Sequence, residues 1–259
     1  MPIFSNEALK DRHIIVTGAS GGIGKAIVDV IVDMGAKVTA TGRNVEKLNE
    51  YFGSNPNVNI FPLDIDQTDQ HENFLRQAIS TFGNVYGLVN NAGTYERGPV
   101  EKLEAETFSK IMHTNWFATV LLTQKVYQHM ISNQTGAIVN IASLSGLRGV
   151  RNNSAYVSSK FALVGFTQSL ALEAIHHGIR VNAVCPGFVN TKMGLDAIRD
   201  RALQNGISYE EQIERLKKEI PAGKIIEPYE VANVTAFLLT DAAYSIVGES
   251  IKISGGTVV

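Results

Sequence analysis

The chain has 259 residues, of which 44% are hydrophobic, which is enough for one sizeable core. Its formal net charge of −2, with 23 basic and 25 acidic residues, argues against general nucleic-acid binding and against a polybasic membrane-binding surface. Residues 1–12 lack the apolar segment of a secretory signal, and no apolar run approaches the ~20 residues of a membrane span. We therefore expect a cytoplasmic protein that does not bind a membrane.

Short apolar runs alternate with amphipathic patterns along the chain. We expect strands at residues 13–18, 36–42, 57–62, 85–89, 136–142, 179–185 and 247–253, and helices at residues 22–34, 44–52, 67–82, 105–132, 154–177 and 228–240. Repeated βα units whose strands are apolar on both faces predict a parallel sheet covered by helices on both sides. No linker or internal repeat interrupts the alternation. Residues 1–259 are therefore predicted to form one α/β domain, a doubly wound sheet of about seven strands.

One region departs from this alternation. Residues 188–226 carry many charges around scattered apolar side chains, after the expected strand 179–185. A long excursion at the carboxyl end of a strand is often a substrate loop or lid. We predict a helical lid at 188–226, and the alternative is a surface insertion without a role.

The first expected strand runs directly into a glycine-rich turn, Thr17-Gly18-Ala19-Ser20-Gly21-Gly22-Ile23-Gly24, and a helical pattern follows at once. Glycine permits a tight turn and lets the backbone approach a pyrophosphate closely. The helix N-terminus offers unpaired N–H groups and partial positive charge to the phosphates. The pattern predicts a Rossmann-type dinucleotide site. The contacts expected here come from Thr17, Gly18, Ser20, Gly21, Gly22, Ile23 and Gly24.

The end of the second expected strand indicates which dinucleotide is bound. NAD enzymes usually carry a carboxylate about twenty residues beyond the glycine turn, but this chain has Gly42 there, followed by Arg43 and Asn44. A planar guanidinium suits a 2′-phosphate. We predict NADP(H) as the cofactor, with contacts from Arg43 and Asn44. The alternative is that Arg43 is an ordinary exposed arginine.

Tyr156 and Lys160 are four residues apart, which places them on one face of the helix expected at 154–177. A phenol has an ordinary pKa near ~10, and a nearby ammonium lowers it by favouring the phenolate. Ser143 follows an apolar run and could donate a hydrogen bond to a carbonyl oxygen as charge develops there. The three residues predict a site that moves a proton to or from an oxygen bound to carbon, although Tyr-x-x-x-Lys alone is also typical of helix surfaces.

Taken in order, these motifs resemble the short-chain dehydrogenase/reductase family over essentially the whole chain. The family's segments are matched by the glycine turn, by Asn90-Asn91-Ala92-Gly93, by Asn115, by Ser143 with Tyr156 and Lys160, and by Pro186-Gly187 with Thr191. The pattern is most similar to 3-oxoacyl-carrier-protein reductases and aromatic polyketide ketoreductases. No Cys/His cluster has metal-ligand spacing, and we expect no metal.

The resemblance implies a role for each catalytic residue. Tyr156 would give the proton in reduction, and Ser143 would orient the carbonyl. Lys160 would hold the nicotinamide ribose and lower the pKa of Tyr156. Asn115 would hold a water that links Lys160 to solvent, and its alternative role is that of a helix kink or core amide.

The resemblance also implies further cofactor contacts, from Asp64, Ile65, Asn91, Ala92, Gly93, Pro186, Gly187, Val189 and Thr191. Asp64 matches the acidic position that meets adenine in relatives, but it could instead cap the helix that follows. Ser254 stands where relatives often have Asp, which leaves one contact near the C-terminus in doubt.

The expected activity is NADPH-dependent reduction of a ketone to an alcohol, on a 3-oxoacyl thioester or polyketide chain. Alternatives are a dehydrogenase for 3-hydroxybutyrate, steroids or another secondary alcohol and, in a different class, a non-catalytic NADP-binding sensor or scaffold. Four basic residues are candidates for attracting a phosphopantetheine arm or an acidic carrier protein, or are scattered solvated charges: Arg97, Arg148, Arg151 and Lys192. We expect a homo-oligomer, dimer or tetramer, through helices 105–132 and 154–177.

Overall fold

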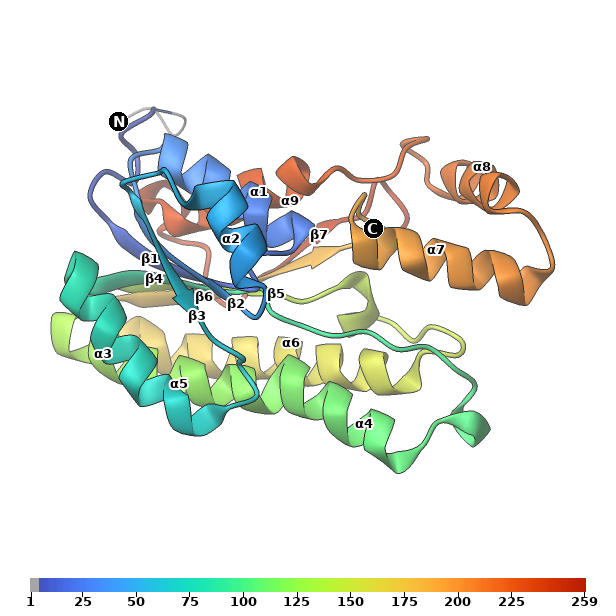
Figure 1. Cartoon of the computed structure of the whole chain (residues 1–259), viewed down its shortest axis with the longest axis horizontal. Coiled ribbons are helices and arrows are strands. Elements are labelled where there is room, and N and C mark those ends of the chain that lie inside the picture. Colours follow the sequence, from blue (N-terminus) through green and yellow to red (C-terminus); the bar gives the residue numbers. More distant parts are fainter. Residues whose placement is uncertain (1–4) are drawn as a thin grey trace.

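The computed structural model describes residues 5–259 (Figure 1). Over this range seven parallel strands form one sheet in the order β3-β2-β1-β4-β5-β6-β7, which confirms the predicted fold class. The strands are β1 His13–Thr17, β2 Lys37–Gly42, β3 Val58–Pro62, β4 Val85–Asn90, β5 Gly136–Ile141, β6 Ile179–Pro186 and β7 Ser250–Ile253.

Helices cover both faces of the sheet. They are α1 Gly22–Asp33, α2 Val45–Phe52, α3 His71–Phe82, α4 Ala105–Met112, α5 Thr119–Asn133, α6 Ser154–Ala174, α7 Lys192–Asn205, α8 Tyr209–Glu219 and α9 Pro228–Leu239. Helices α1, α2 and α9 lie on one face, and α3, α4, α5 and α6 lie on the other (Figure 1). Within residues 5–259, no helix has the length and apolarity needed to cross a membrane.

Each face of the sheet has its own apolar core. Ile27 and Ile31 of α1 pack with Val231 of α9 on one side, and Phe74 of α3 packs with Leu122 of α5 on the other. Strands β1, β5 and β6 are buried at every residue, because helices cover both faces. This double burial explains why their sequences are nearly continuous apolar runs, and the single cysteine lies within one of them as a buried free thiol.

The strand order changes direction beside β1, which pairs with β2 on one side and β4 on the other. The chain therefore leaves these neighbouring strands toward opposite faces of the sheet. In open α/β sheets the resulting crevice at the carboxyl ends of the strands is where ligands bind. The glycine turn and the Asn90–Gly93 segment lie at this edge.

The single helix predicted for residues 105–132 is wrong in one respect. The chain forms α4 and α5 with a π-helical turn, His113–Ala118, between them. The Thr119 hydroxyl donates to the carbonyl of Thr114, five residues earlier, at 3.2 Å. Apolar periodicity continues through such a widened turn, so the sequence pattern does not reveal it. Single-turn π-bulges are frequent at functional sites, and this one contains Asn115.

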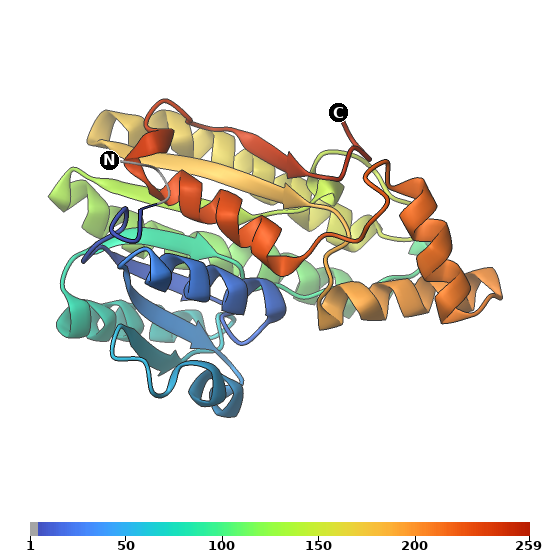
Figure 2. The same ribbon diagram turned by 90° about the horizontal axis from the view of Figure 1, so that it is seen from above.

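Residues 188–226 form a compact two-helix arm made of α7 and α8. Seen from above, the arm extends beyond the end of the sheet (Figure 2). Its two ends are joined, because the Asn190 N–H donates to the Ile226 carbonyl at 2.8 Å and the Ile226 N–H donates to the Phe188 carbonyl at 3.1 Å. Ile198 and Leu216 belong to a small apolar cluster within the arm. The arm thus has its own packing and a fixed base.

Candidate active site

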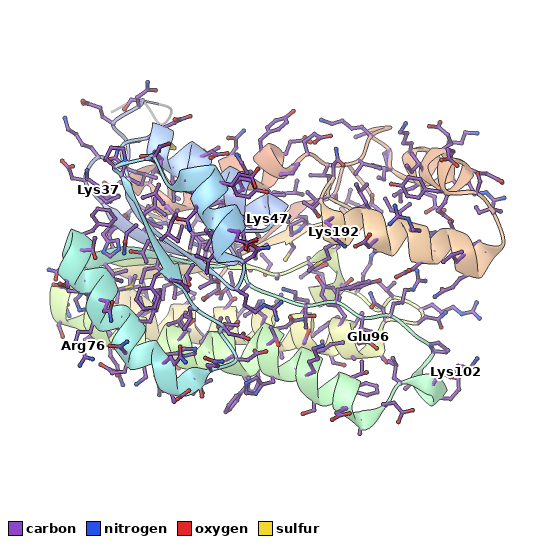
Figure 3. All side chains as sticks on the ribbon, in the orientation of Figure 1. Lys37, Lys47, Arg76, Glu96, Lys102 and Lys192 are labelled. Atoms are coloured by element: carbon purple, nitrogen blue, oxygen red, sulfur yellow. The ribbon has the colours of Figure 1, made fainter. Side chains whose placement is uncertain are left out.

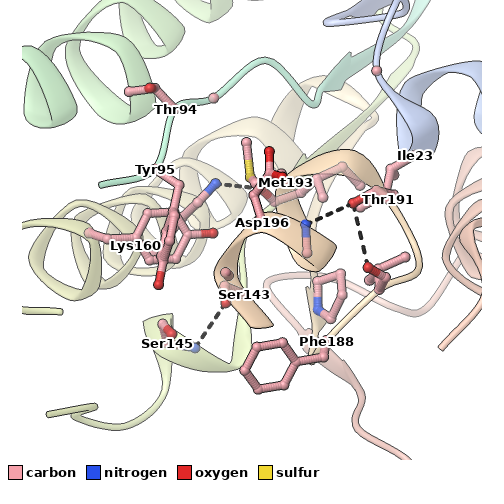
Figure 4. A pocket seen from close by; sticks show the side chains of 18 of the residues that line it. Ile23, Thr94, Tyr95, Ser143, Ser145, Lys160, Phe188, Thr191, Met193 and Asp196 are labelled. Atoms are coloured by element: carbon pink, nitrogen blue, oxygen red, sulfur yellow. Dashed lines mark hydrogen bonds between the residues drawn. The ribbon is translucent and has the colours of Figure 1, made fainter. Parts of the chain in front are cut away.

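A cleft of about 1120 Å³ opens at the carboxyl edge of the strands, and residues of α7 and α8 line part of it. Figure 4 shows some of the lining side chains, among them Met193 and Asp196 of α7. Loops that follow β1, β2, β3, β4, β5 and β6 all contribute to its lining. Among the predicted site residues, Gly24 and Asn115 are absent from the lining, and every other one is part of it. Segments far apart in sequence thus form one site.

The glycine turn forms a cradle whose tightness requires residues without a side chain. Gly18 has φ +64, and a Cβ there would lie 2.9 Å from the Ala92 Cα. A Cβ on Gly22 would lie 2.8 Å from Cγ2 of Thr191. A Cβ on Gly24 would lie 2.3 Å from the Gly18 carbonyl oxygen, so Gly24 keeps α1 against the turn rather than facing the cleft.

Asn91 braces the turn from the neighbouring strand. Its Nδ2 donates to the carbonyls of Thr17 at 3.0 Å and Gly18 at 3.1 Å. The backbone N–H groups of Asn91 and Ala92 each donate to the Thr17 hydroxyl at 3.0 Å. These four bonds fix the ends of β1 and β4 relative to each other.

The residues at the end of β2 fit a phosphorylated ribose. Gly42, Arg43 and Asn44 line the cleft next to Ser20, and Arg43 is exposed. A Cβ at position 42 would lie 3.1 Å from the Ser20 hydroxyl oxygen, so Gly42 lets this hydroxyl lie close to the end of β2. Asn44 Oδ1 accepts from the Lys47 N–H at 2.9 Å and caps α2. The corner presents a guanidinium and a hydroxyl, which are donors for a 2′-phosphate.

Asp64 lies at the cleft, and the predicted alternative that it caps the following helix is wrong, because the N-cap position of α3 is Gln70. The Asp64 Oδ1 accepts a hydrogen bond from the Asp66 N–H at 3.2 Å, which closes the turn after β3. On the other side of the cleft, the Thr191 hydroxyl accepts from the Gly194 N–H at 3.2 Å and caps α7 (Figure 4). Thr191 therefore fixes the beginning of α7 beside the glycine turn.

Tyr156, Lys160 and Ser143 converge in the middle of the cleft. Lys160 Nζ lies 5.7 Å from the centre of the Tyr156 ring and donates to the Ile141 carbonyl at 2.9 Å. Ser143 follows β5, and its hydroxyl oxygen accepts from the Ser145 N–H at 3.1 Å. Figure 4 shows Lys160 and Ser143 among the residues that line the same pocket. The phenol, the ammonium and the hydroxyl are thus brought together as the spacing predicted.

The predicted lowering of the Tyr156 pKa by Lys160 is wrong for this structure. Burial raises the pKa of Tyr156 to about 12, and the hydrogen bond with Ser143 offsets only part of that effect. Burial also lowers the pKa of Lys160 to about 8. The sequence argument considered the charge of Lys160 but could not include the desolvation of both groups. At neutral pH the phenol therefore keeps its proton, and the ammonium keeps its charge.

Asn115 lies behind the cleft wall and is 1% exposed. Its Nδ2 donates to the Thr94 carbonyl at 2.9 Å and to the Ser159 hydroxyl at 3.0 Å, and its Oδ1 accepts from the Thr94 N–H at 2.7 Å. The side chain is therefore a core amide, the alternative that the sequence left open. It joins the loop after β4 to α6 beside Lys160, while the water that we expect at this point stays a prediction.

Sequence reasoning missed Tyr95. Its ring meets the Tyr156 ring edge-on, with centroids 5.1 Å apart, and it lines the cleft (Figure 4). No motif marks this position, and the one available signal is an aromatic residue immediately after the Asn90–Thr94 segment. Asn153 was also missed, and it lines the cleft three residues before Tyr156.

The cleft mouth is mixed in charge rather than uniformly basic. Its lining includes the four predicted basic residues Arg97, Arg148, Arg151 and Lys192, together with the acidic Asp196, Asp200 and Glu219. Lys192 pairs with Asp196 at 2.6 Å. Figure 3 labels Lys192 at the start of α7 and Glu96 on the segment between β4 and α4.

Comparisons with known proteins agree with this geometry. The family model for short chain dehydrogenases matches residues 12–202. A 3-oxoacyl-[acyl-carrier-protein] reductase of Vibrio cholerae is 34% identical, with 96% of this chain and 98% of the relative covered. A putative ketoacyl reductase of the granaticin polyketide synthase of Streptomyces violaceoruber is 35% identical, with 93% and 91% covered.

A solved structure of a variant of actinorhodin polyketide ketoreductase with NADPH has a TM-score of 0.91 and 31% identity. The match covers 96% of this chain and 98% of that one. The chain therefore belongs to the short-chain dehydrogenase family. Both the predicted family and its oxidoreductase class are confirmed.

Proposed function

We propose that the protein is an NADPH-dependent ketoreductase that converts a ketone to a secondary alcohol, on a 3-oxoacyl thioester or a polyketide chain. The observation that carries this proposal is the convergence of Tyr156, Lys160 and Ser143 in a cleft that also contains the glycine turn. Arg43 and the absence of an acid at Gly42 favour NADPH over NADH. The names of the relatives add support for a carbonyl substrate on an acyl chain.

NADPH, when bound, supplies the hydride that reduces the carbonyl carbon. The turn Thr17–Gly24, Arg43 and the Asn91–Gly93 segment would hold the cofactor. Tyr156 gives its phenolic proton to the carbonyl oxygen, a general acid contribution of ~10²–10⁴-fold.

Ser143 donates a hydrogen bond to the same oxygen as negative charge develops there. Lys160 would hold the nicotinamide ribose, and its Nζ lies 5.7 Å from the centre of the Tyr156 ring. Together the three side chains hold the carbonyl and supply its proton. The chemistry needs no metal-ligating residue from this chain.

The long arm 188–226 supports an extended substrate. Helices α7 and α8 add Met193, Ala197, Leu216 and other side chains to the cleft lining, which lengthens it beyond the catalytic residues. We propose that this arm is the substrate lid. The basic side chains at the mouth, Arg148 and Arg151, suit the phosphate of a phosphopantetheine arm, so a carrier protein is a candidate partner.

We also propose a cytoplasmic homo-oligomer, a dimer or tetramer. Large apolar side chains are exposed on α6 and on the π-helical turn before α5: Phe161 is 45% exposed, Leu172 72% and Phe117 44%. A second copy of the chain could bury such side chains. The prediction is checked by measuring the mass of the protein in solution by light scattering, and a monomer at all concentrations would contradict it.

The function is tested by following NADPH consumption with 3-oxoacyl thioesters, cyclic ketones and polyketide mimics. The expected result is turnover of the thioesters or polyketide mimics, with NADPH preferred to NADH. Activity restricted to secondary alcohols with NAD would favour the dehydrogenase alternative. NADPH binding without turnover of any carbonyl would favour the sensor.

A further inference from the structure

One wall of the cleft is built from two segments, residues 94–98 after β4 and residues 148–153 before α6. They are joined where the Gly98 N–H donates to the Asn152 carbonyl at 3.0 Å. The residues next to this bond, one from each segment, are therefore held on the same part of the wall.

Both segments adjoin the catalytic phenol. Tyr95, from the first segment, packs edge-on against the Tyr156 ring, with centroids 5.1 Å apart. Asn153, at the end of the second segment, precedes Tyr156 by three residues, so the two side chains lie on one side of the first turn of α6. A substrate whose ketone oxygen meets Tyr156 therefore has its neighbouring carbons close to this wall.

Asn153 occupies the N-cap position of α6, but its side chain does not cap the helix. At the same position before α2, α7 and α8, the side chains of Asn44, Thr191 and Ser208 each accept a hydrogen bond from the first turn. Asn153 is 5% exposed and lines the cleft, and its Oδ1 is buried without a hydrogen-bond partner among residues 5–259. An unused cap and a buried unpaired acceptor both cost stability. This side chain therefore indicates a ligand that donates a hydrogen bond to it.

Arg97 supplies the complementary group on the same wall. It lines the cleft, and its Nε is buried without a hydrogen-bond partner in the described part of the chain. The Nε–H of a guanidinium only donates, whereas the Oδ1 of an asparagine only accepts. The wall thus presents one unpaired donor and one unpaired acceptor beside the catalytic phenol.

A hydroxyl is the group that suits both atoms. It can donate its hydrogen to Asn153 Oδ1 while its oxygen accepts from the Arg97 Nε–H. A carbonyl or carboxylate oxygen would leave Asn153 unpaired, because it has no hydrogen to donate. An ammonium would leave Arg97 unpaired and would be repelled by the charge of the guanidinium.

We propose that Asn153 and Arg97 bind a hydroxyl group of the substrate on the first or second carbon from the ketone, so that the preferred substrates are hydroxyketones. Asn153 Oδ1 accepts a hydrogen bond from this hydroxyl, and Arg97 Nε donates one to its oxygen. The inference rests on the proposed ketoreductase function and adds a group that the substrate chain carries beside its ketone. Asn153 and Arg97 determine specificity and take no part in the proton transfer.

The test compares ketones that differ only in this group. In 3-hydroxy-2-butanone and 4-hydroxy-2-butanone the hydroxyl is on the first and the second carbon from the ketone. Their methyl ethers keep the oxygen but cannot donate a hydrogen bond, and 2-butanone lacks the oxygen. For the unsubstituted protein, kcat/KM should be about tenfold or more higher for at least one hydroxyketone than for its ether or for 2-butanone, because only the hydroxyl pairs the buried acceptor.

Variants at position 153 identify the atom responsible. N153L removes the acceptor at similar size and should abolish the advantage of the hydroxyketone, with the rates for its ether and for 2-butanone unchanged. N153D keeps an acceptor oxygen and gives up the NH₂ group, so it should retain the advantage. N49L makes the matching change at an exposed asparagine of α2 outside the cleft lining and should match the unsubstituted protein.

R97M separates the second partner from the first. The ether oxygen can still accept from the Arg97 Nε–H, so R97M should lower kcat/KM for the hydroxyketone and for its ether alike and leave 2-butanone unchanged. N153L should affect the hydroxyketone alone. This difference between the two variants is expected only if one residue accepts from the hydroxyl and the other donates to it.

A second readout does not depend on turnover. Calorimetric titration of the preferred hydroxyketone into the protein with NADP⁺ should give weaker binding to N153L, with NADP⁺ affinity and the thermal unfolding midpoint unchanged. Equal losses in N153L on the hydroxyketone, its ether and 2-butanone would overturn the proposal, as would loss of the advantage in N153D. A loss in N153L confined to the N-acetylcysteamine thioester of 3-oxobutanoate would also overturn it, because Asn153 would then serve the amide N–H of the thioester arm.

The failure of the subsite and the failure of the proposed function give different results. If the unsubstituted protein reduces the thioester or 2-butanone with NADPH but has no advantage for either hydroxyketone, only the subsite is wrong. If it reduces none of these ketones, the proposed function is wrong, and the titration decides the subsite. Weaker hydroxyketone binding to N153L would then uphold the subsite, and equal binding would overturn it.

Discussion

Burial acts on Tyr156 and Lys160 in opposite directions, and this sets the resting state of the site. The Tyr156 pKa of about 12 keeps the phenol protonated, and the Lys160 pKa of about 8 leaves the ammonium charged at neutral pH but not far above it. The site is therefore ready to donate a proton to a ketone. Its charge state becomes sensitive to pH only on the alkaline side.

This balance predicts the pH dependence of ketone reduction. The charged form of Lys160 is present below about pH 8 and is lost above it, so kcat/KM should fall about tenfold per pH unit above that point. K160M should be slow at every pH and should lack the alkaline fall. Rates measured from about pH 6 to about pH 10 check this prediction. A rate that stays level to the alkaline limit would show that the ammonium charge is not required.

At the scale of single residues, the sequence could predict that Tyr156 and Lys160 lie together at the cleft, because four-residue spacing places two side chains on one helix face. It could not predict the pKa values, which depend on desolvation by residues from several elements. Tyr95 and Asn153 could not be predicted as cleft residues for a related reason. Each enters the cleft through the path of its loop and not through a recognisable motif.

Among the elements, the arm 188–226 shows how a separate packing unit can be attached to a rigid sheet. Its base is held by backbone hydrogen bonds between the Phe188–Asn190 segment and Ile226, while its interior depends on a few apolar residues of α7 and α8. Such a unit can loosen without loss of the main cores. Its packing should therefore affect substrate binding more than cofactor binding.

The variant I198A tests this division. Ile198 is fully buried in the arm but does not line the cleft. Truncating it should cost about 2–5 kcal/mol of arm packing, increase hydrogen exchange in residues 192–219, and raise KM for long acyl substrates while NADPH affinity stays unchanged. L203A is the matched control, because Leu203 is 75% exposed on the same helix. If hydrogen exchange in residues 192–219 is equally slow in I198A and in the unsubstituted protein, the lid is not an independently packed unit.

Most helices and strands of the sheet could be predicted, because a repeated βα unit produces a regular alternation of short apolar runs and amphipathic helical patterns in the sequence. The departures have local physical causes. The helix widens into a π-turn at His113–Ala118, but the apolar periodicity of the sequence continues through that turn and so does not reveal it. The arm was expected as one excursion, but its two helices could not be separated by pattern because many charges interrupt their apolar faces.

For the whole molecule, two buried histidines outside the cleft lining carry a second kind of pH sensitivity. His13, at the start of β1, is buried and contacts the Gly83 carbonyl at 2.9 Å and the Thr39 hydroxyl at 2.8 Å. His71 is fully buried on α3 and contacts the Ile65 carbonyl at 2.8 Å. Burial lowers the pKa of both imidazoles below the ordinary value of 6.5.

These depressed pKa values predict acid destabilisation. Above pH 6.5 both histidines are neutral in the folded and unfolded chains, so their contribution to stability is fully present. Below it the unfolded chain binds protons that the folded chain resists, so the free energy of unfolding falls as pH drops. Urea unfolding at several pH values checks this. With H13Q, the free energy of unfolding should fall less steeply below pH 6.5, whereas the surface variant H176Q should behave like the unsubstituted protein. Equal pH dependence in the unsubstituted protein, H13Q and H176Q would contradict the assignment.

The most direct test of the whole account is NADPH-dependent ketone reduction by Y156F, with NADPH binding measured on the same sample. The substitution removes the phenolic proton and leaves the ring against Tyr95, so NADPH affinity should be unchanged. Turnover should fall by about 10²-fold or more. Ketone reduction at the unsubstituted rate in Y156F, with NADPH still bound, would show that Tyr156 does not supply the proton.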